Sequence, residues 1–318
     1  MNFKDDYTVI CIDGGGTKTN GVLFVGNDIV AQIKYGTTRI GAVGFGEACE
    51  RTLTLIIELC KSAQIETSEV DVIVVGLAGC WLESEKKRAL YLIKTLASTS
   101  GVTINDLVVT SDAEIAMEGA FGGELGIITI VGTGSIGLAK YNSDKPFARC
   151  GGWGIELDDE GSGAWVGREG VTAVVRAIDG RGKQTMLTAK LTELVPRFDL
   201  EQPRTIVSAY NDRDFEYQYV TPLVMKCADA GDIVCTKIIE RAAKHLAELP
   251  ASLLKHFTID KVNIALMGGI IENDTLLSNK LKEELAKNKR IVLVEPRGDA
   301  IAGAKTIGIN VIDELANE

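Results

Sequence analysis

Residues 8–25 read Thr-Val-Ile-Cys-Ile-Asp-Gly-Gly-Gly-Thr-Lys-Thr-Asn-Gly-Val-Leu-Phe-Val. Two apolar runs, over 9–12 and 22–25, predict strands, and Asp13 stands at the end of the first strand. Between them Gly14, Gly15 and Gly16 predict a tight turn whose backbone N–H groups can approach an anion. The glycine spacing is not that of a Walker loop or a dinucleotide fingerprint, and no helix follows. The pattern predicts a phosphate-binding β-hairpin.

The same architecture recurs about one domain further along. An apolar strand over 126–131 is followed by Gly132-Thr-Gly-Ser-Ile-Gly137 and a second apolar run over 138–141. The two units differ residue by residue, but each has the order strand, Gly/Thr turn, strand. A duplicated unit with two phosphate hairpins facing each other is the simplest interpretation.

Length and composition limit the possible functions. A chain of 318 residues with 46% hydrophobic and 25% charged residues predicts a globular protein of two domains. The net charge of −10 argues against a nucleic-acid partner, whose phosphates need a basic face. It does not argue against ATP, because a few local groups and a metal ion can neutralise the triphosphate.

Cysteine and histidine usage argues against zinc and iron–sulfur sites. The two histidines, His245 and His256, make a zinc site or a His-based triad improbable. Buried thiols without disulfides are expected for the scattered cysteines at 11, 49, 60, 80, 150, 227 and 235.

No apolar run reaches membrane length and the start of the chain is not a signal peptide, so we expect a cytoplasmic protein with no membrane partner.

The remaining pattern alternates strands with helices, which is typical of an α/β protein. We expect a flexible segment over 36–44 and mainly helices over 182–260, with breaks near Pro203, Pro222 and Pro250. Strands are predicted over 29–35, 71–77, 107–110, 262–267 and 291–294, and helices over 46–63, 84–98, 163–178, 274–286 and from 298 onward.

Five motifs in this order resemble the actin/hexokinase/Hsp70-type ATPase superfamily, and within it the N-acetylglucosamine kinase group of the BadF/BadG/BcrA/BcrD family. Each motif alone is weak, but together they span nearly the whole chain. They are Ile12-Asp-Gly-Gly-Gly-Thr-Lys-Thr19, Ser111-Asp-Ala113, Gly132-Thr-Gly-Ser135, Gly151-Gly-Trp-Gly154 with Asp159-Glu-Gly-Ser-Gly163, and Gly268-Gly269.

The resemblance implies an α/β fold of two RNase H-like, actin-like ATPase domains with a cleft between them. We expect the first domain over 1–118, joined by a terminal helix over 303–318. The second domain, with a helical insertion, is expected over 119–302. A homodimer is common in the group and is a further expectation.

The resemblance also assigns ATP and Mg²⁺ as cofactors. Asp13 is expected to orient the metal, through water or directly, and the alternative is a carboxylate that caps the turn. Lys18 would add charge near the phosphates, or lie solvated on the turn. The expected ATP-binding residues are Gly14, Gly15, Gly16, Thr17, Lys18, Gly132, Thr133, Gly134, Ser135, Gly268 and Gly269.

The resemblance implies that Asp112 is the general base, and a carboxylate at a helix start can accept the proton of an attacking sugar hydroxyl. The alternative is an acid that only favours the helix dipole. Glu114 and Glu118 are expected to be surface or capping residues. The substrate side would also include Gly151, Gly152, Trp153 and Asp159, with Trp153 either facing the sugar or forming part of the core.

Thr38 and Arg39 lie where relatives that take N-acetylglucosamine usually carry an Asn that contacts the sugar. Arg39 is either a surface arginine or a partner for a substrate carboxylate. N-Acetylmuramic acid is N-acetylglucosamine with an added lactyl carboxylate, so a kinase that accepts it would benefit from a cation here.

We therefore expect an ATP-dependent kinase for the 6-hydroxyl of N-acetylglucosamine, extending to N-acetylmuramic acid. The alternatives are a kinase for glucosamine or another hexose, and an activator ATPase of an acyl-CoA dehydratase or reductase. The activator is disfavoured because the sequence has no cysteine cluster for an iron–sulfur centre. A sugar-responsive repressor is disfavoured because Asp13 leaves no room before it for a DNA-binding domain.

Overall fold

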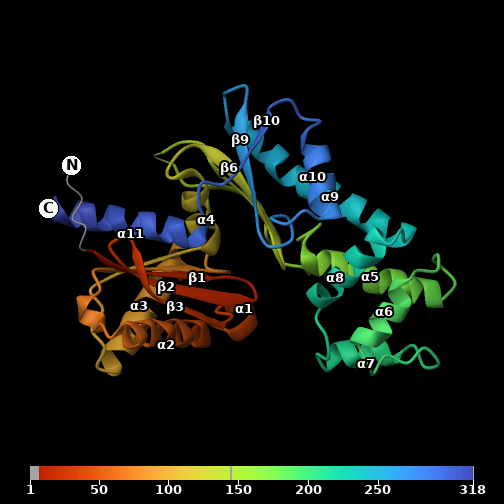
Figure 1. The fold of residues 1–318 in the computed structure, drawn as a ribbon, viewed down its shortest axis with the longest axis horizontal. Helices are drawn as coiled ribbons and strands as arrows, with labels where there is room; N and C mark the ends of the chain where they lie inside the picture. The colour runs from red at the N-terminus through yellow and green to blue at the C-terminus, as the bar shows by residue number, and fades with distance from the viewer. Residues whose placement is uncertain (1–6, 144, 318) are drawn as a thin grey trace. The chain divides into compact units, whose positions relative to one another are not determined.

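A computed structural model describes residues 7–143 and 145–317 (Figure 1). The chain divides into two compact units, one ending at Glu124 and completed from Glu295 onward, the other spanning Leu125–Val294. Each unit has one five-stranded sheet, in the orders β3-β2-β1-β4-β5 and β8-β7-β6-β9-β10. In each sheet the first three strands are antiparallel and the other two run parallel to the first strand of the hairpin. This repeated topology confirms the expected fold of two RNase H-like units.

The first unit holds the opening hairpin. Its strands are β1 (Thr8–Gly14), β2 (Lys18–Val25), β3 (Asp28–Gly36), β4 (Val72–Leu77) and β5 (Asp106–Thr110). Its helices are α1 (Ile40–Val43), α2 (Phe45–Ala63), α3 (Glu83–Thr99), α4 (Asp112–Phe121) and α11 (Ala300–Ala316), with a 3₁₀ turn η1 (Thr67–Glu69).

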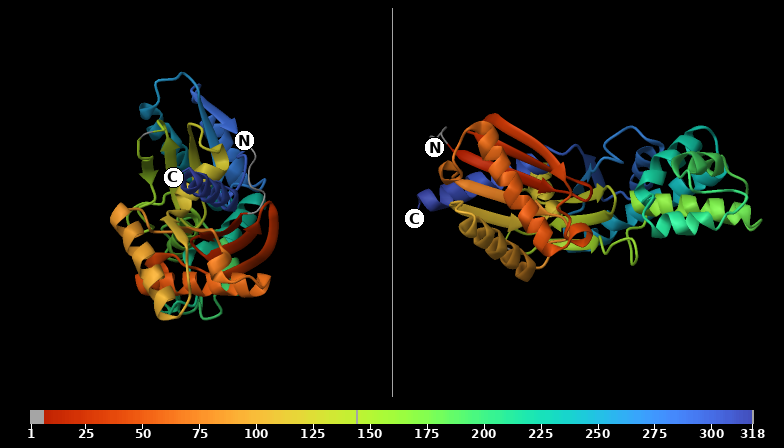
Figure 2. Two further views of the ribbon diagram at one scale, coloured as in Figure 1. Left: turned by 90° about the vertical axis from the view of Figure 1, so that its left-hand side faces the viewer. Right: turned by 90° about the horizontal axis from the view of Figure 1, so that it is seen from below.

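The side chains of β1 alternate between the two faces of the sheet, and this alternation explains why the strand is apolar throughout. Ile10 and Ile12 pack with α2 and α3 on one face of the sheet, and Val9 and Cys11 pack with α4 and α11 on the other. A strand covered on both faces has no solvent side and therefore needs apolar residues throughout. Figure 2 shows α2 lying along its face of this sheet.

The first unit also includes the residues that lead into α11. Gly119 of α4 and Gly303 of α11 let the two helices touch: a Cβ on Gly119 would lie 1.9 Å from the Asp299 carbonyl oxygen. The Arg297 amide also donates to the carbonyl of Ala120, at 3.1 Å. Residues 295–302 therefore belong with the first unit, whereas we expected them in the second.

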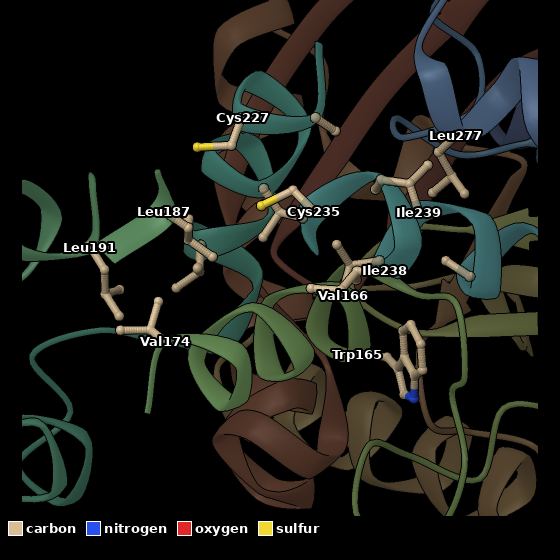
Figure 3. Packing of buried hydrophobic residues seen from close by; sticks show 14 of the residues in the cluster. Trp165, Val166, Val174, Leu187, Leu191, Cys227, Cys235, Ile238, Ile239 and Leu277 are labelled. Carbon is tan, nitrogen blue, oxygen red and sulfur yellow. The ribbon is translucent and has the colours of Figure 1, made fainter. Parts of the chain in front are cut away.

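The second unit adds a helical layer to its sheet. Its strands are β6 (Gly126–Val131), β7 (Ser135–Lys140), β8 (Ala148–Gly151), β9 (Val262–Met267) and β10 (Ile291–Val294). Its helices are α5 (Gly163–Ile178), α6 (Leu187–Leu194), α7 (Thr205–Asn211), α8 (Tyr217–Asp229), α9 (Ile233–Leu253) and α10 (Leu276–Leu285), with a 3₁₀ turn η2 (Leu254–His256). Trp165, Val166, Leu187, Cys235 and Ile239 belong to the core of this layer (Figure 3).

Three local expectations were wrong. The segment 36–44 contains the short helix α1, and β8 was not predicted because Ala148–Gly151 has no apolar pattern. Pro222 and Pro250 lie inside α8 and α9 rather than at breaks. Buried residues on both sides of each proline hold the helices in place, so packing overrides the loss of one backbone hydrogen bond.

Candidate active site

The first turn offers backbone donors to an anion. The carbonyl oxygens of Gly15 and Gly16 both accept from the Thr37 hydroxyl, at 3.1 and 3.2 Å. The amides of Gly15, Gly16 and Thr17 lie outside the β1–β2 ladder and have no hydrogen-bond partner in the part of the chain that the structure describes. Thr17 and Lys18 are exposed at the tip. The turn therefore has the donors that a phosphate requires.

Asp13 and Asp112 lie in the same region of the first unit. Asp13 is the penultimate residue of β1 and pairs with Asn20 of β2 and Gly76 of β4, and Asp112 is the first residue of α4, just after β5. Burial raises the pKa of Asp13 to about 7, with further contributions from the nearby charges of Asp112 and Asp299, while Lys18 acts in the opposite direction. A carboxylate whose pKa is raised by burial and by neighbouring negative charges, beside a turn with free amides, is typical of a functional site.

The Asp112 side chain is half-buried, and the partial loss of solvent raises its pKa to about 6. Its Oδ1 accepts a hydrogen bond from the Ala113 amide at 3.0 Å, which acts in the opposite direction on the pKa. A carboxylate with a pKa near 6 is ionised at neutral pH and is a stronger base than an exposed aspartate. This environment suits proton abstraction better than plain helix capping, a role that Ser111 already fills.

Glu114 fixes the start of α4. Its carboxylate accepts from the Ser111 amide at 2.9 Å and from the Thr110 hydroxyl, and it pairs with Lys86 at 2.8 Å. Burial alone would raise the pKa of Glu114, but these donors together hold it below its usual value. The expectation of a capping residue is confirmed for Glu114, and the buried partner Lys86 is an addition from the structure.

Thr38 and Arg39 follow β3. The Thr38 side chain is fully buried and its hydroxyl shares a 3.0 Å hydrogen bond with the Thr19 hydroxyl. Arg39 precedes α1, and its Nε is buried without a hydrogen-bond partner among the described residues. A guanidinium N–H in that condition is available for an incoming acceptor.

In the second unit the predicted Gly132–Ser135 turn lies against the start of α5. The amides of Gly163 and Ala164 donate to the carbonyls of Gly132 and Thr133, at 2.8 and 3.0 Å. The Ser135 hydroxyl donates to the Glu160 carbonyl at 3.2 Å and is buried, so it supports the turn. Gly132, Thr133 and Gly134 are half-buried and therefore more accessible than Ser135.

Asp159 connects the 151–163 loop to this turn. It is 7% exposed with a left-handed φ of 60°, and its Oδ1 accepts from the Ser135 amide at 3.4 Å. Gly134 has no Cβ where one would lie 2.8 Å from the Asp159 carboxylate. The acid is therefore packed directly beneath the turn, whereas Glu156 and Glu160 are exposed.

Trp153 is 66% exposed, which excludes the alternative of a core tryptophan; the buried ring is Trp165. The Arg149 guanidinium lies 4.7 Å from the centre of the Trp153 ring. Gly151 and Gly152, with φ values of 75° and 74°, turn the chain between β8 and this ring. The loop presents an aromatic face to solvent, as a sugar platform requires.

Gly268 and Gly269 follow β9, which pairs with β6. Gly268 has a φ of 105°, and a Cβ there would lie 2.4 Å from the Val131 carbonyl, so glycine is needed for packing beside the Gly132 turn. Gly269 has open space around its Cα. Thr275, not Asn273, caps α10. The side-chain amide of Asn273 instead donates to the Gly269 carbonyl at 2.9 Å.

Sequence reasoning missed two residues of the first unit. Asp299, which caps α11 by accepting from Ala302, contributes to the field at Asp13. The sequence Gly298-Asp299-Ala300 before a helix was a signal for that cap. The sequence did not identify Thr37 as a site residue, because its hydrogen bonds to the turn depend on the register of β3 against β2.

The fit of a magnesium ion can be tested on these groups. Within residues 7–143 and 145–317 no three His, Cys, Asp or Glu side chains form a metal-binding group. Mg²⁺ typically takes one or two carboxylates together with waters and phosphate oxygens. Asp13, in a field of like charges, fits that pattern, and the other carboxylates among the described residues provide no closed cage.

No helix in the described part of the chain is long and apolar enough to cross a membrane. Six of the cysteines are buried, Cys150 is half-buried, and all are free thiols, as expected.

Comparison with known proteins agrees with the geometry. The chain is 27% identical over 309 residues to an N-acetylmuramic acid/N-acetylglucosamine kinase of Clostridium acetobutylicum, covering 96% of this chain and 99% of that one. It is 28% identical to an N-acetyl-D-glucosamine kinase of Dictyostelium discoideum, covering 95% and 97%. A solved Chromobacterium violaceum structure, assigned as an N-acetylglucosamine kinase, superposes with a TM-score of 0.76 at 26% identity, covering 96% and 99%. The model of the BadF/BadG/BcrA/BcrD ATPase family matches residues 10–308, and the chain belongs to this family.

Proposed function

We propose that the protein is an ATP-dependent kinase that phosphorylates the 6-hydroxyl of an N-acetylated amino sugar, with Asp112 as general base. The observation that carries the proposal is that Asp13 and Asp112 both lie next to Gly76 of β4, and that the turn after Asp13 has free amides. The kinase names of the relatives in Clostridium acetobutylicum and Dictyostelium discoideum support the amino-sugar class.

Phosphoryl transfer is mainly positioning and charge neutralisation. The amides of Gly15, Gly16 and Thr17 bind phosphate oxygens, and Lys18 at the tip adds a positive charge. The Gly132–Ser135 turn offers the same chemistry in the second unit, and open space at Gly269 admits the nucleoside. Asp13 would hold Mg²⁺ through water or directly, and the ion would neutralise phosphate charge when bound.

Asp112 removes the proton from the 6-hydroxyl as that oxygen attacks the γ-phosphorus. The bond between the γ-phosphorus and the bridging oxygen breaks, ADP leaves, and the proton resides on the Asp112 carboxyl. Trp153 provides a face for the sugar ring, and the buried Asp159 supports the Gly132–Ser135 turn. Thr38 serves by holding the segment that carries Arg39.

A coupled assay of ADP release with a sugar panel tests the proposal. We expect N-acetylglucosamine and N-acetylmuramic acid to stimulate ADP release strongly, and glucosamine and glucose weakly. A dominant response to glucosamine would favour the activity named for a Vibrio cholerae relative, which is 26% identical. The absence of any sugar-dependent ADP release would reject the kinase.

Arg39→Ala tests whether the unpaired guanidinium binds a substrate carboxylate. A charge-assisted bond contributes ~1.5–3 kcal/mol, so we expect kcat/KM for N-acetylmuramic acid to fall by about 10- to 100-fold. The same constant for N-acetylglucosamine, which has no carboxylate, should change less than about threefold. Steady-state kinetics with both sugars measure the difference, and equal losses would contradict a carboxylate partner. Arg39→Lys retains the charge and should recover part of the N-acetylmuramic acid activity.

A further inference from the structure

Thr37 lies between the first phosphate turn and the Arg39 segment and touches both. Its hydroxyl donates to the carbonyls of Gly15 and Gly16, at 3.1 and 3.2 Å, and accepts from the Arg39 amide at 3.0 Å. A hydroxyl has one hydrogen to donate and lone pairs to accept with, so this single group uses both capacities at once. It is the direct polar link that the described residues provide between the turn and the Arg39 backbone.

Two further hydrogen bonds hold the segment around Thr37. The Thr37 carbonyl accepts from Arg51 at 2.9 Å, and Arg51 is held by Glu47 of the same helix α2, at 2.7 Å. The Ile40 amide, just after Arg39, donates to the Ala78 carbonyl at 3.1 Å. With the segment anchored to α2 and to the end of β4, the Thr37 hydroxyl determines where the turn lies relative to Arg39.

The direction of these bonds matters for the turn. Because the Gly15 and Gly16 carbonyls are occupied by Thr37, the peptide planes of the turn are restrained and its amides stay unpaired for phosphate. Movement of the Arg39 backbone toward a ligand pulls on the acceptor side of the same hydroxyl. A shift at one end therefore changes the hydrogen-bond geometry at the other.

We propose that Thr37 is a positioning residue that couples nucleotide binding at the first turn to substrate binding at Arg39, so that each ligand raises the affinity for the other. The coupling rests on the proposed kinase function for its sugar half and on the phosphate turn alone for its nucleotide half. By linkage, the factor by which the sugar raises nucleotide affinity equals the factor by which the nucleotide raises sugar affinity.

The substitutions Thr37→Val and Thr37→Ser separate shape from hydrogen bonding. Valine keeps the branched shape but cannot bond to Gly15, Gly16 or Arg39, whereas serine keeps the hydroxyl. Thr54→Val is the matched control, because Thr54 is exposed and, among the described residues, its hydroxyl donates only to the carbonyl of Glu50 in its own helix.

Calorimetric titration of the full-length protein with a non-hydrolysable ATP analogue and Mg²⁺, with and without saturating N-acetylglucosamine, measures the coupling. For the wild type and Thr37→Ser we expect the sugar to tighten nucleotide binding by about fivefold or more, within the usual range of coupling. For Thr37→Val we expect that factor to fall to about one. Nucleotide affinity without sugar should also fall by about three- to tenfold, which corresponds to one lost hydrogen bond. Thr54→Val should match the wild type in both measurements.

The outcomes are distinguishable. Equal coupling in the wild type and Thr37→Val, no coupling in the wild type, or loss of coupling in Thr37→Ser would overturn the role of Thr37. If no sugar binds, the proposed function fails, but the titrations without sugar still test the link to the turn. Thermal melts of each variant identify a folding defect, and a fall in coupling with an unchanged melting temperature supports positioning rather than general destabilisation.

Discussion

Asp112→Asn is expected to lower kcat for sugar phosphorylation by at least about 100-fold, while the affinity for the ATP analogue changes little. General acid–base catalysis contributes about 10²- to 10⁴-fold, and an amide cannot accept the hydroxyl proton. Asn occupies nearly the same volume and still accepts from the Ala113 amide, so the start of α4 should be preserved. Single-turnover kinetics and nucleotide titration on the same protein separate the two effects.

The pH dependence follows from the same group. Burial raises the pKa of Asp112 to about 6, and only its ionised form can act as a base. We expect kcat/KM of the wild type to rise with pH through about 6 and then level off, and the residual activity of Asp112→Asn to lack that rise. A control is Glu118→Gln, a change on the same helix outside the first turn. Retention of more than a tenth of kcat in Asp112→Asn would show that another group is the base.

The contribution of Asp112 to stability should fall as pH rises, whereas its contribution to activity should increase. A carboxyl whose pKa in the folded state is raised from 3.8 to about 6 binds its proton more tightly when folded than when unfolded. Its contribution to stability is therefore present below about pH 4 and is lost as pH rises through 6. At pH 8 Asp112→Asn is accordingly expected to melt above the wild type, and at pH 4 the difference should shrink. The base is thus held charged in a place where charge is costly, which is a common condition of catalytic carboxylates.

The sequence predicted those parts of the site in which the interacting residues lie close together along the chain. Asp13 with its three glycines, and Ser111 with Glu114, are encoded within a few residues, so their turn and capping chemistry could be read directly. Asp299 and Lys86 come from segments far along the chain and reach the site only through helix and strand packing.

The same difference between local and long-range interactions applies to the prediction of the fold. Apolar runs in strands and helices predicted nearly every element, because periodicity reflects burial. Strand β8 was not predicted because its residues have no apolar pattern. Pro222 and Pro250 led to the wrong prediction of helix breaks, because the packing around them overrides their local preference. The domain boundary depended on two glycines, Gly119 and Gly303, whose role appears only once α4 and α11 are in contact.

Gly303→Ala is expected to have the largest effect on stability. A Cβ at this position would lie 1.9 Å from the Ile115 carbonyl oxygen and 2.4 Å from the Gly119 amide nitrogen. Both are backbone atoms of α4, so no side-chain rotation can relieve the clash, and α11 must move away from α4. Overpacking in a tight core typically costs ~1–3 kcal/mol, and loss of close helix packing places this change at the upper end.

Gly46→Ala is the matched control, since Gly46 is also helical and has nothing within 4 Å of an added Cβ. There alanine should stabilise by ~0.5–1 kcal/mol, because it restricts the unfolded chain and favours the helix. Urea unfolding of both variants gives the comparison. The contrast matters for function because α4 begins with Asp112: if α11 shifts α4, Gly303→Ala should also lower kcat at temperatures where the protein remains folded. Equal stability of the two variants would mean that α4 and α11 do not pack through Gly119 and Gly303.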